Sequence, residues 1–291
     1  MIYNFDLFKK YGNLFTAFSQ KNNGSMKLSD NSELAEKITP NRNNYFLKNN
    51  TDSAKVVSAG IVHGSKVAIV DEKDCGKIVL GTDGLLSQEK NLFLSITSAD
   101  CLPIFLFDPK NKVIGIIHAG WRSLAENILT NAVEKIKKLG GAPEDILVGI
   151  GPAICQKHYE VGPEVAEKFS EYPSAILKEN NKIFLDLKKI AQLQLLDLRL
   201  KNENIEISPE CNFELPKKYF SARRDKKKEI ETMIAVIGMK NIVCVPKRNR
   251  TFISGSLPAF VCAIIQLCSN IFYQKFLKIV SEGGCGDSFS P

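Results

Sequence analysis

Three residues of the chain could bind a metal ion together: His63, Cys101 and His118. Each stands near a glycine or proline at the end of an apolar segment, where a chain turns. Two imidazoles and one thiolate suit zinc, and three protein ligands leave a fourth position for water, as in catalytic zinc sites. Zinc lowers the pKa of that water and so makes a hydroxide nucleophile. The three residues lie far apart in the sequence, so spacing alone equally permits two strand-end histidines and a core cysteine.

Asp100 precedes this cysteine between two apolar runs. A carboxylate in such a stretch needs a partner or an opening to solvent. It could orient a metal ligand or face the open metal position, or it could cap backbone N–H groups in a turn. The same segment also permits a metal-free hydrolase, with Cys101 as nucleophile and His118 or His63 as base. His158 has no comparable neighbours in the sequence and is expected to be structural or to lie on the surface.

Arginines near these segments could bind an anion. Arg122 stands just before an expected helix, whose N-terminus would favour an anion, although a structural salt bridge is the commoner role of such a residue. Arg223 and Arg224 stand beside an expected strand end, where alternation sends them to opposite faces. One of them could therefore enter the site. The segment Thr82–Gly84 is expected to be a turn rather than a ligand contact.

The surrounding segments alternate between strand and helix patterns. Apolar and β-branched runs predict strands at residues 56–64, 65–71, 92–97, 102–108, 112–120, 218–225 and 233–239. Between them, Ser123 and Glu126 fit a capping box, and apolar residues at helical spacing predict a helix that ends at Gly140-Gly141. These patterns predict an α+β fold, with mixed β-sheets covered by helices in one compact domain.

Composition limits the class of protein. The chain has 291 residues, 44% of them hydrophobic and 24% charged, as in a globular protein with a sizeable core. The net charge of +7 comes largely from short lysine clusters without interleaved aromatic residues. We therefore expect no nucleic-acid partner, but the charge would favour anions such as phosphate.

The eight cysteines include no C-x-x-C pair, and the N-terminal residues lack an apolar signal segment. A cytoplasmic protein with free thiols is therefore expected. The character of the sequence changes after about Met239. Residues 256–273 are nearly apolar, but Gln266 and Asn270 interrupt them, which favours a tail or a packed helix over a membrane span.

Five ordered segments resemble those of the laccase-domain family, the YfiH-type purine nucleoside phosphorylases once called polyphenol oxidases. They are VHG, TSADCLP, HAGWRS, GPAI and FSARRD. A TDGLL turn and the pair Asn41-Arg42 extend the resemblance, which covers roughly residues 12–238. Residues 1–239 would then form the family's domain, and residues 240–291 an extension of unknown role.

The resemblance implies two sheets layered between helices, and zinc bound by His63, Cys101 and His118. It implies phosphorolysis of adenosine, inosine and S-methyl-5′-thioadenosine, together with adenosine deamination. The partners would be a purine nucleoside and phosphate, and the assembly a homodimer. We expect Cys101, His118 and Asp100 to be the catalytic residues. The substrate-binding arginines would be Arg42, Arg122, Arg223 and Arg224.

Other hypotheses stay open. Two histidines and a cysteine could hold a single blue copper. A multicopper oxidase is disfavoured, because its further copper centre needs many more histidines than the three in this chain. The resemblance also allows a role in cell-wall (peptidoglycan) editing. The sequence departs from the family pattern at Ile61, where glutamine is usual, at Ser123, where glycine is usual, and at 226–231, where a Thr-Gly-Arg segment is usual.

Overall fold

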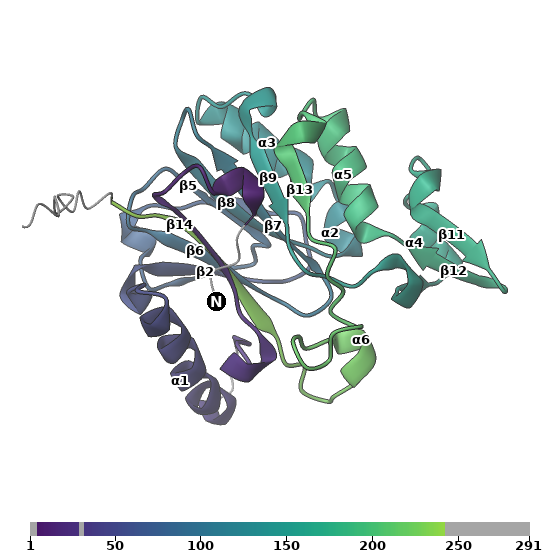
Figure 1. Ribbon diagram of the computed structural model, residues 1–291, viewed down its shortest axis with the longest axis horizontal. Helices are drawn as coiled ribbons and strands as arrows, with labels where there is room; N and C mark the ends of the chain where they lie inside the picture. Colours follow the sequence, from purple (N-terminus) through teal and green to yellow (C-terminus); the bar gives the residue numbers. More distant parts are fainter. Residues whose placement is uncertain (1–4, 29–31, 242–291) are drawn as a thin grey trace, which may run out of the picture. The chain divides into compact units, whose positions relative to one another are not determined.

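Two β-sheets stack face to face in the computed structural model, which describes residues 5–28 and 32–241 (Figure 1). The first sheet contains, in spatial order, β1 (Leu14–Phe18), β14 (Met233–Met239), β6 (Phe93–Ser98), β2 (Val56–Gly60) and β4 (Ile78–Leu80). The second contains β13 (Ile205–Ile207), β9 (Leu147–Ile150), β7 (Leu102–Asp108), β8 (Val113–Ala119), β5 (Gly84–Ser87) and β3 (Val67–Ile69). A small third sheet contains β10 (Glu160–Val161), β12 (Lys182–Leu185) and β11 (Ile176–Glu179).

Helices cover the outer faces of the two stacked sheets (Figure 1). Tyr45 and Phe46 of α1 (Ser32–Lys48) share a core cluster with Phe93 of the first sheet. The second sheet is covered by α3 (Ile128–Lys138) and α5 (Leu187–Asp197). The other α-helices of the described part are short: α2 (Trp121–Ala125), α4 (Pro163–Glu167) and α6 (Ala222–Asp225). This helix–sheet–sheet–helix layering confirms the predicted α+β sandwich.

The central strand β7 explains how an apolar run serves both layers. Every one of its residues is buried. Because successive side chains of a strand point to opposite faces, Phe105 and Phe107 enter the core between the sheets. Ile104 and Leu106 pack on the other face, in the core beneath α3 and α5. A strand buried on both faces can be continuously apolar, as this one is from Leu102 to Phe107.

The helix predicted from Ser123 to Gly140 is broken in the structure. Asn127 has a left-handed φ of 61°, which interrupts the helical path, so α2 ends at Ala125 and α3 begins at Ile128. Ser123 lies inside α2 and is buried, so the predicted capping box is wrong. The predicted end is confirmed, since Gly140 follows α3 with a φ of 92°.

Two predicted strands also differ. The segment 218–225 forms no strand, because the Ser221 hydroxyl accepts the backbone N–H of Arg224 at 3.1 Å and starts the helical turn α6. The strand predicted over residues 56–64 ends at Gly60, so His63 lies in the following loop. The closing strand predicted at 233–239 is confirmed as β14, which pairs with β1 and β6.

All the described elements belong to one unit, Met1–Val243. Within the predicted extension, the structure describes Lys240 and Asn241. The backbone N–H of Lys240 donates to the Asn13 carbonyl at 2.8 Å, which extends the pairing of β14 with β1 by one hydrogen bond. The apolar stretch 256–273 lies outside the described residues. No helix among the described residues is long and apolar enough to cross a membrane.

Candidate metal centre

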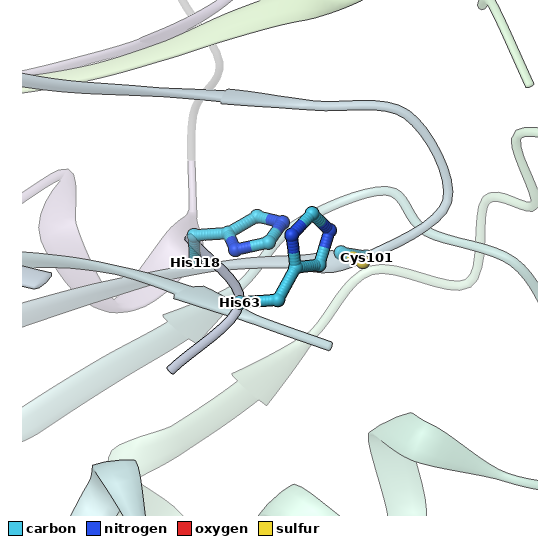
Figure 2. A group of neighbouring side chains, drawn as sticks. All are labelled: His63, Cys101 and His118. Atoms are coloured by element: carbon cyan, nitrogen blue, oxygen red, sulfur yellow. The ribbon is translucent and has the colours of Figure 1, made fainter. Parts of the chain in front are cut away.

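Figure 2 shows the side chains of His63, Cys101 and His118 together, although they come from three separate segments. Cys101 directly precedes β7, and His118 lies in β8 opposite Pro103. Because β7 and β8 are antiparallel neighbours, the start of one and the end of the other meet at one edge of the sheet. His63 reaches this edge from the loop between β2 and β3. The donor atoms of the three side chains lie within 4.8 Å of one another.

Asp83 holds two of these three residues in place. Its buried carboxylate accepts the consecutive backbone N–H groups of Val62, His63 and Gly64 at 2.8–3.1 Å. These bonds stabilise the left-handed φ of 62° at His63, which is uncommon for a residue other than glycine. The same carboxylate lies 3.0 Å from His118 Nδ1. Since a carboxylate only accepts, neutral His118 carries its proton on Nδ1 and a free lone pair on Nε2.

The charges of these side chains favour a thiolate. Burial by itself would raise the pKa of Cys101, but His118 and His63 outweigh it and bring that pKa to about 6. Burial would likewise lower the pKa of His118, but the Cys101 thiolate and Asp83 raise it to about 9. A thiolate is the form in which cysteine binds metal. It is also the form in which cysteine acts as a nucleophile beside a histidine.

The donor set fits a metal ion. Metal–nitrogen and metal–sulfur bonds of zinc run about 2.0–2.3 Å, so donor atoms this close can share one ion. The Asp83–His118 hydrogen bond supplies the carboxylate partner that metal-binding histidines typically have. Gly120 leaves room for the sulfur, since a Cβ atom at this position would lie 2.9 Å from Cys101 Sγ.

The three candidate ligands line a cavity of about 510 Å³. Its wall is partly apolar, with side chains of Leu28, Ile61 and Ile230, and partly aromatic, with Trp121 and Tyr159. This volume lies in the range of small-molecule sites, which combine apolar walls with a few polar groups.

The Asp100 side chain lines the cavity, and its hydrogen bonds go to α6 and not to the three candidate ligands. Its Oδ2 accepts the Ser221 hydroxyl at 3.0 Å and the backbone N–H of Arg223 at 2.7 Å, and thereby caps α6. Its Oδ1 is buried and makes no hydrogen bond with the described residues. Burial raises the pKa of this carboxyl, and the bonds from Arg223 and Ser221 oppose the rise. The sequence suggested Asp100 as the acceptor that orients a metal-binding histidine. In the structure Asp83 has this position, 3.0 Å from His118 Nδ1.

Two of the four predicted arginines line the cavity. The Arg122 guanidinium lies 4.3 Å from the Trp121 ring centre. The Arg223 guanidinium lies 5.0 Å from the Tyr159 ring centre and donates from Nη1 to the Glu160 carbonyl at 2.7 Å. The cavity wall thus carries two cations, each beside an aromatic ring.

The other two arginines lie elsewhere. Arg42 donates to the Met26 carbonyl at 2.9 Å and to the Ser58 hydroxyl at 3.0 Å, and it lines a second cavity of about 270 Å³. Burial lowers the pKa of Arg42 to about 10. Arg224 pairs with Asp225 at 2.7 Å, and its terminal nitrogens also donate to the backbone carbonyls of Asn212, Phe213 and Tyr219. Arg224 therefore joins α6 to the preceding loop.

Comparison with known proteins decides the family. Residues 8–240 match the family described as multi-copper polyphenol oxidoreductase laccase. The chain belongs to this family. Over 204 residues, 66% of this chain and 73% of the relative, it is 36% identical to a protein named purine nucleoside phosphorylase YlmD from Bacillus subtilis. Over 175 residues, 56% of this chain and 67% of the relative, it is 31% identical to a protein named adenosine deaminase RL5 from an unknown prokaryotic organism.

Two solved structures share the laccase-domain fold. YlmD from Geobacillus stearothermophilus superposes with a TM-score of 0.74 at 28% identity, and covers 79% of this chain and 93% of its own. The hypothetical protein YfiH from Bacillus licheniformis superposes with a TM-score of 0.73 at 28% identity, and covers 80% of this chain and 95% of its own.

Sequence reasoning missed the role of Asp83, because the predicted turn at 82–84 explained that acid locally. A signal was available, since a buried metal-binding histidine needs an acceptor, and an acid next to a strand of the same sheet could supply one. Sequence reasoning also missed the neighbours of His158, which lies within reach of Cys155 and Glu214.

Proposed function

We propose that this protein is a zinc-dependent purine nucleoside phosphorylase whose active site is the cavity around His63, Cys101 and His118. The observation that carries the proposal is the convergence of two imidazoles and one thiol at a cavity that two arginines also line. The names of the family relatives support the substrate class, a purine nucleoside with phosphate.

Zinc would be held by His63, Cys101 and His118. When bound, it would act as a Lewis acid and lower the pKa of a water ligand. The chain's own part is to prepare the ligands. The Asp83 carboxylate keeps the proton of neutral His118 on Nδ1, so the lone pair on Nε2 is free to bind the metal. The same carboxylate fixes the loop that carries His63. The close approach at Gly120 lets the Cys101 sulfur reach the cavity.

Arg122 and Arg223 would bind the phosphate. In phosphorolysis a phosphate oxygen forms a bond to the ribose C1′ while the bond from C1′ to the purine nitrogen breaks, so phosphate must be held beside the sugar. A guanidinium offers several N–H donors in a planar fork that matches phosphate. Trp121 and Tyr159 lie beside the two guanidinium groups and would favour their position at the cavity wall.

The apolar and aromatic parts of the wall would hold the purine. Leu28, Ile61 and Ile230 offer contacts for the base and for a 5′-methylthio group, which supports adenosine, inosine and S-methyl-5′-thioadenosine as substrates. The unpaired Oδ1 of Asp100 would accept a hydrogen bond from a hydroxyl or amino group of the substrate. Asp100 would at the same time position Arg223 through its backbone N–H.

Adenosine deamination is a second candidate activity of the same cavity. It is favoured by the likeness to the relative named adenosine deaminase. Water would add at the purine C6 and ammonia would leave, which needs a water close to the base. The same cavity could therefore cleave or deaminate adenosine, depending on whether phosphate or water attacks.

Cys101 could instead be a covalent nucleophile, because its pKa of about 6 suits either role. Cys101→Ser separates the two. If Cys101 is a ligand, the variant should bind zinc more weakly, and excess zinc should partly restore turnover. If Cys101 is a nucleophile, the variant should stay inactive at every zinc concentration, and a covalent adduct should be trappable on the wild type.

The proposal is tested by incubating the purified chain with adenosine, with and without phosphate, and separating the products by chromatography. Adenine that forms only with phosphate would establish phosphorolysis, and inosine would establish deamination. A zinc-loaded protein that converts no nucleoside would refute the proposal and favour a role in cell-wall editing.

A further inference from the structure

A second group of metal-binding side chains lies outside the cavity. The donor atoms of Cys155, His158 and Glu214 lie within 4.8 Å of one another. A further thiol lies beside Cys155, because Cys211 Sγ accepts the backbone N–H of Cys155 at 3.2 Å. Cys211 is buried, with 2% of its surface exposed, while Cys155 and His158 are half-buried and Glu214 is exposed.

The local structure presents these four residues as two matching turns. Cys155 precedes the short 3₁₀ turn Gln156–His158, so Cys155 and His158 are three positions apart at its two ends. Cys211 begins another turn, which the hydrogen bond from Leu215 N to the Cys211 carbonyl closes at 3.2 Å, and Glu214 lies three positions after Cys211. Paired ligands separated by two residues, in two turns distant in sequence, are typical of structural zinc sites.

The backbone fixes the two turns against each other. A parallel bridge joins Ala153 to Cys211, and Asn212 N donates to the Ala153 carbonyl at 3.1 Å. The positions of both thiols are therefore set by backbone pairing and not by the side chains themselves. A prearranged pair of thiols reduces the ordering that metal binding requires.

The contacts that His158 and Glu214 make within the protein do not compete strongly with a metal. His158 Nε2 lies 3.2 Å from Glu214 Oε1, and the His158 ring stacks on Phe213 with 4.2 Å between the ring centres. The stacking orients the imidazole while leaving its nitrogens at the ring edge. Lys157 also contacts Glu214, but both side chains are on the surface, where such an ion pair contributes about 0–1 kcal/mol.

We propose that Cys155, His158, Cys211 and Glu214 bind a structural zinc ion, separate from the site in the cavity. Two sulfur ligands, one imidazole and one carboxylate satisfy the four positions that structural zinc prefers, without an open position for substrate. Thiolate sulfur also favours zinc over magnesium or calcium, which prefer oxygen. The ion would replace the Lys157–Glu214 contact and would bind both thiols as thiolates.

The place of this site suggests its role. Tyr159, in the cavity wall, directly follows His158. Arg224 donates to the carbonyls of Asn212 and Phe213, which lie between Cys211 and Glu214, and the neighbouring Arg223 lines the cavity. Zinc would therefore join the segment that leads into Tyr159 to the loop that Arg224 of α6 contacts, and so help to position Tyr159 and Arg223 at the cavity wall.

The zinc content of the full-length chain tests this inference. Wild type, Cys155→Ser, His158→Ala and Cys101→Ser are purified with a reductant, supplied with zinc, freed of loosely bound metal by gel filtration and analysed by mass spectrometry of the metal. Cys75→Ser is the matched control, since Cys75 belongs to neither group. Circular dichroism checks folding, and His158→Ala changes a half-buried side chain outside the core.

Cys155→Ser and His158→Ala should each contain about one zinc ion per chain less than wild type. Cys75→Ser should match wild type. Cobalt loading gives a second readout, because Cys155→Ser should lose most of the sulfur-to-cobalt absorption, which arises mainly from the site with two thiols. The inference would be overturned if Cys155→Ser and His158→Ala both contained as much zinc as wild type. A Cys155–Cys211 disulfide that persists in protein purified with the reductant would also overturn it. If instead the cavity binds no zinc, Cys101→Ser would match wild type while Cys155→Ser and His158→Ala would still lose zinc, which separates that failure from this one.

Discussion

Replacing Asp83 with asparagine should weaken metal binding in the cavity while leaving the shape of the side chain nearly unchanged. The carboxylate accepts four hydrogen bonds, two on each oxygen: His63 N and His118 Nδ1 on Oδ1, and Val62 N and Gly64 N on Oδ2. An amide has one acceptor oxygen and one donor NH₂ group. The NH₂ group must therefore face two N–H donors, whichever way the side chain turns.

Each orientation has its own consequence. If the NH₂ group faces His118, the imidazole must accept at Nδ1, which moves the proton to Nε2 and blocks the ligand atom. If the NH₂ group faces Val62 N and Gly64 N, the loop that carries His63 loses two hydrogen bonds. Buried donors left without an acceptor cost about 1–3 kcal/mol.

Loss of a residue that orients a metal ligand typically lowers metal affinity about 10- to 100-fold, which corresponds to about 1.4–2.7 kcal/mol. We expect Asp83→Asn to lose zinc affinity by this factor. The unsatisfied donors should lower the free energy of unfolding by about 1–3 kcal/mol. In a domain of this size, that loss should lower Tm by roughly 2–12 °C. A competition titration with a chromophoric chelator measures the affinity, and thermal unfolding measures the stability.

Asp108→Asn is the matched control. Asp108 is also fully buried and also accepts backbone N–H groups, those of Lys110 and Asn111, but it lies at the far end of β7 from Cys101. The Asp108→Asn variant should be less stable than wild type and should bind zinc with wild-type affinity. If Asp83→Asn binds zinc as tightly as wild type and differs only in Tm, as the control does, Asp83 serves the turn alone and the reasoning about His118 fails.

Three further predictions follow from the same geometry. Arg223→Ala should raise the KM for phosphate by at least about tenfold, since charge-assisted hydrogen bonds contribute about 1.5–3 kcal/mol, and Arg223→Lys should recover part of it; an unchanged KM would remove Arg223 from the phosphate site. In metal-free protein, alkylation of Cys101 should rise through about pH 6 and then level off, because the thiolate is the reactive form. In His118→Ala the inflection should move to higher pH, since His63 alone then opposes the rise in the Cys101 pKa that burial causes; peptide mass spectrometry follows the rate, and the same inflection in both proteins would contradict the pairing. A chain ending at Asn241 should keep wild-type Tm and activity, because β14 and the Lys240–Asn13 bond are retained; loss of folded protein would show that residues 242–291 are needed.

Much of the fold could be predicted from local patterns. The run at 102–108 is apolar enough for a strand buried on both faces, and it forms β7. The helix break at Asn127 could not be predicted, because it depends on a single left-handed residue inside a continuous apolar periodicity. Residues 218–225 followed strand alternation, but Ser221 and Asp100 cap a helical turn there, and Asp100 is distant in sequence.

The candidate ligands could be named from residue type and from the family resemblance, but their support could not. His63 and His118 are two of the three histidines in the chain, and both lie near a glycine, while Cys101 lies near a proline. Asp83 contacts His118 because β5 and β8 are neighbours in the second sheet, and no local pattern specifies that pairing. The Cys155 and Cys211 turns were missed for the same reason, since their spacing becomes informative only when the backbone bridge joins them.

Zinc titration of metal-free protein tests the central claim most directly, with adenine release from adenosine and phosphate as the readout. The rate should be near zero in chelator and should rise with zinc until the cavity site is filled. His118→Ala, which removes one ligand, should need far more zinc or remain inactive. Full activity of the wild-type protein in chelator, or filled sites without adenine release, would contradict the account.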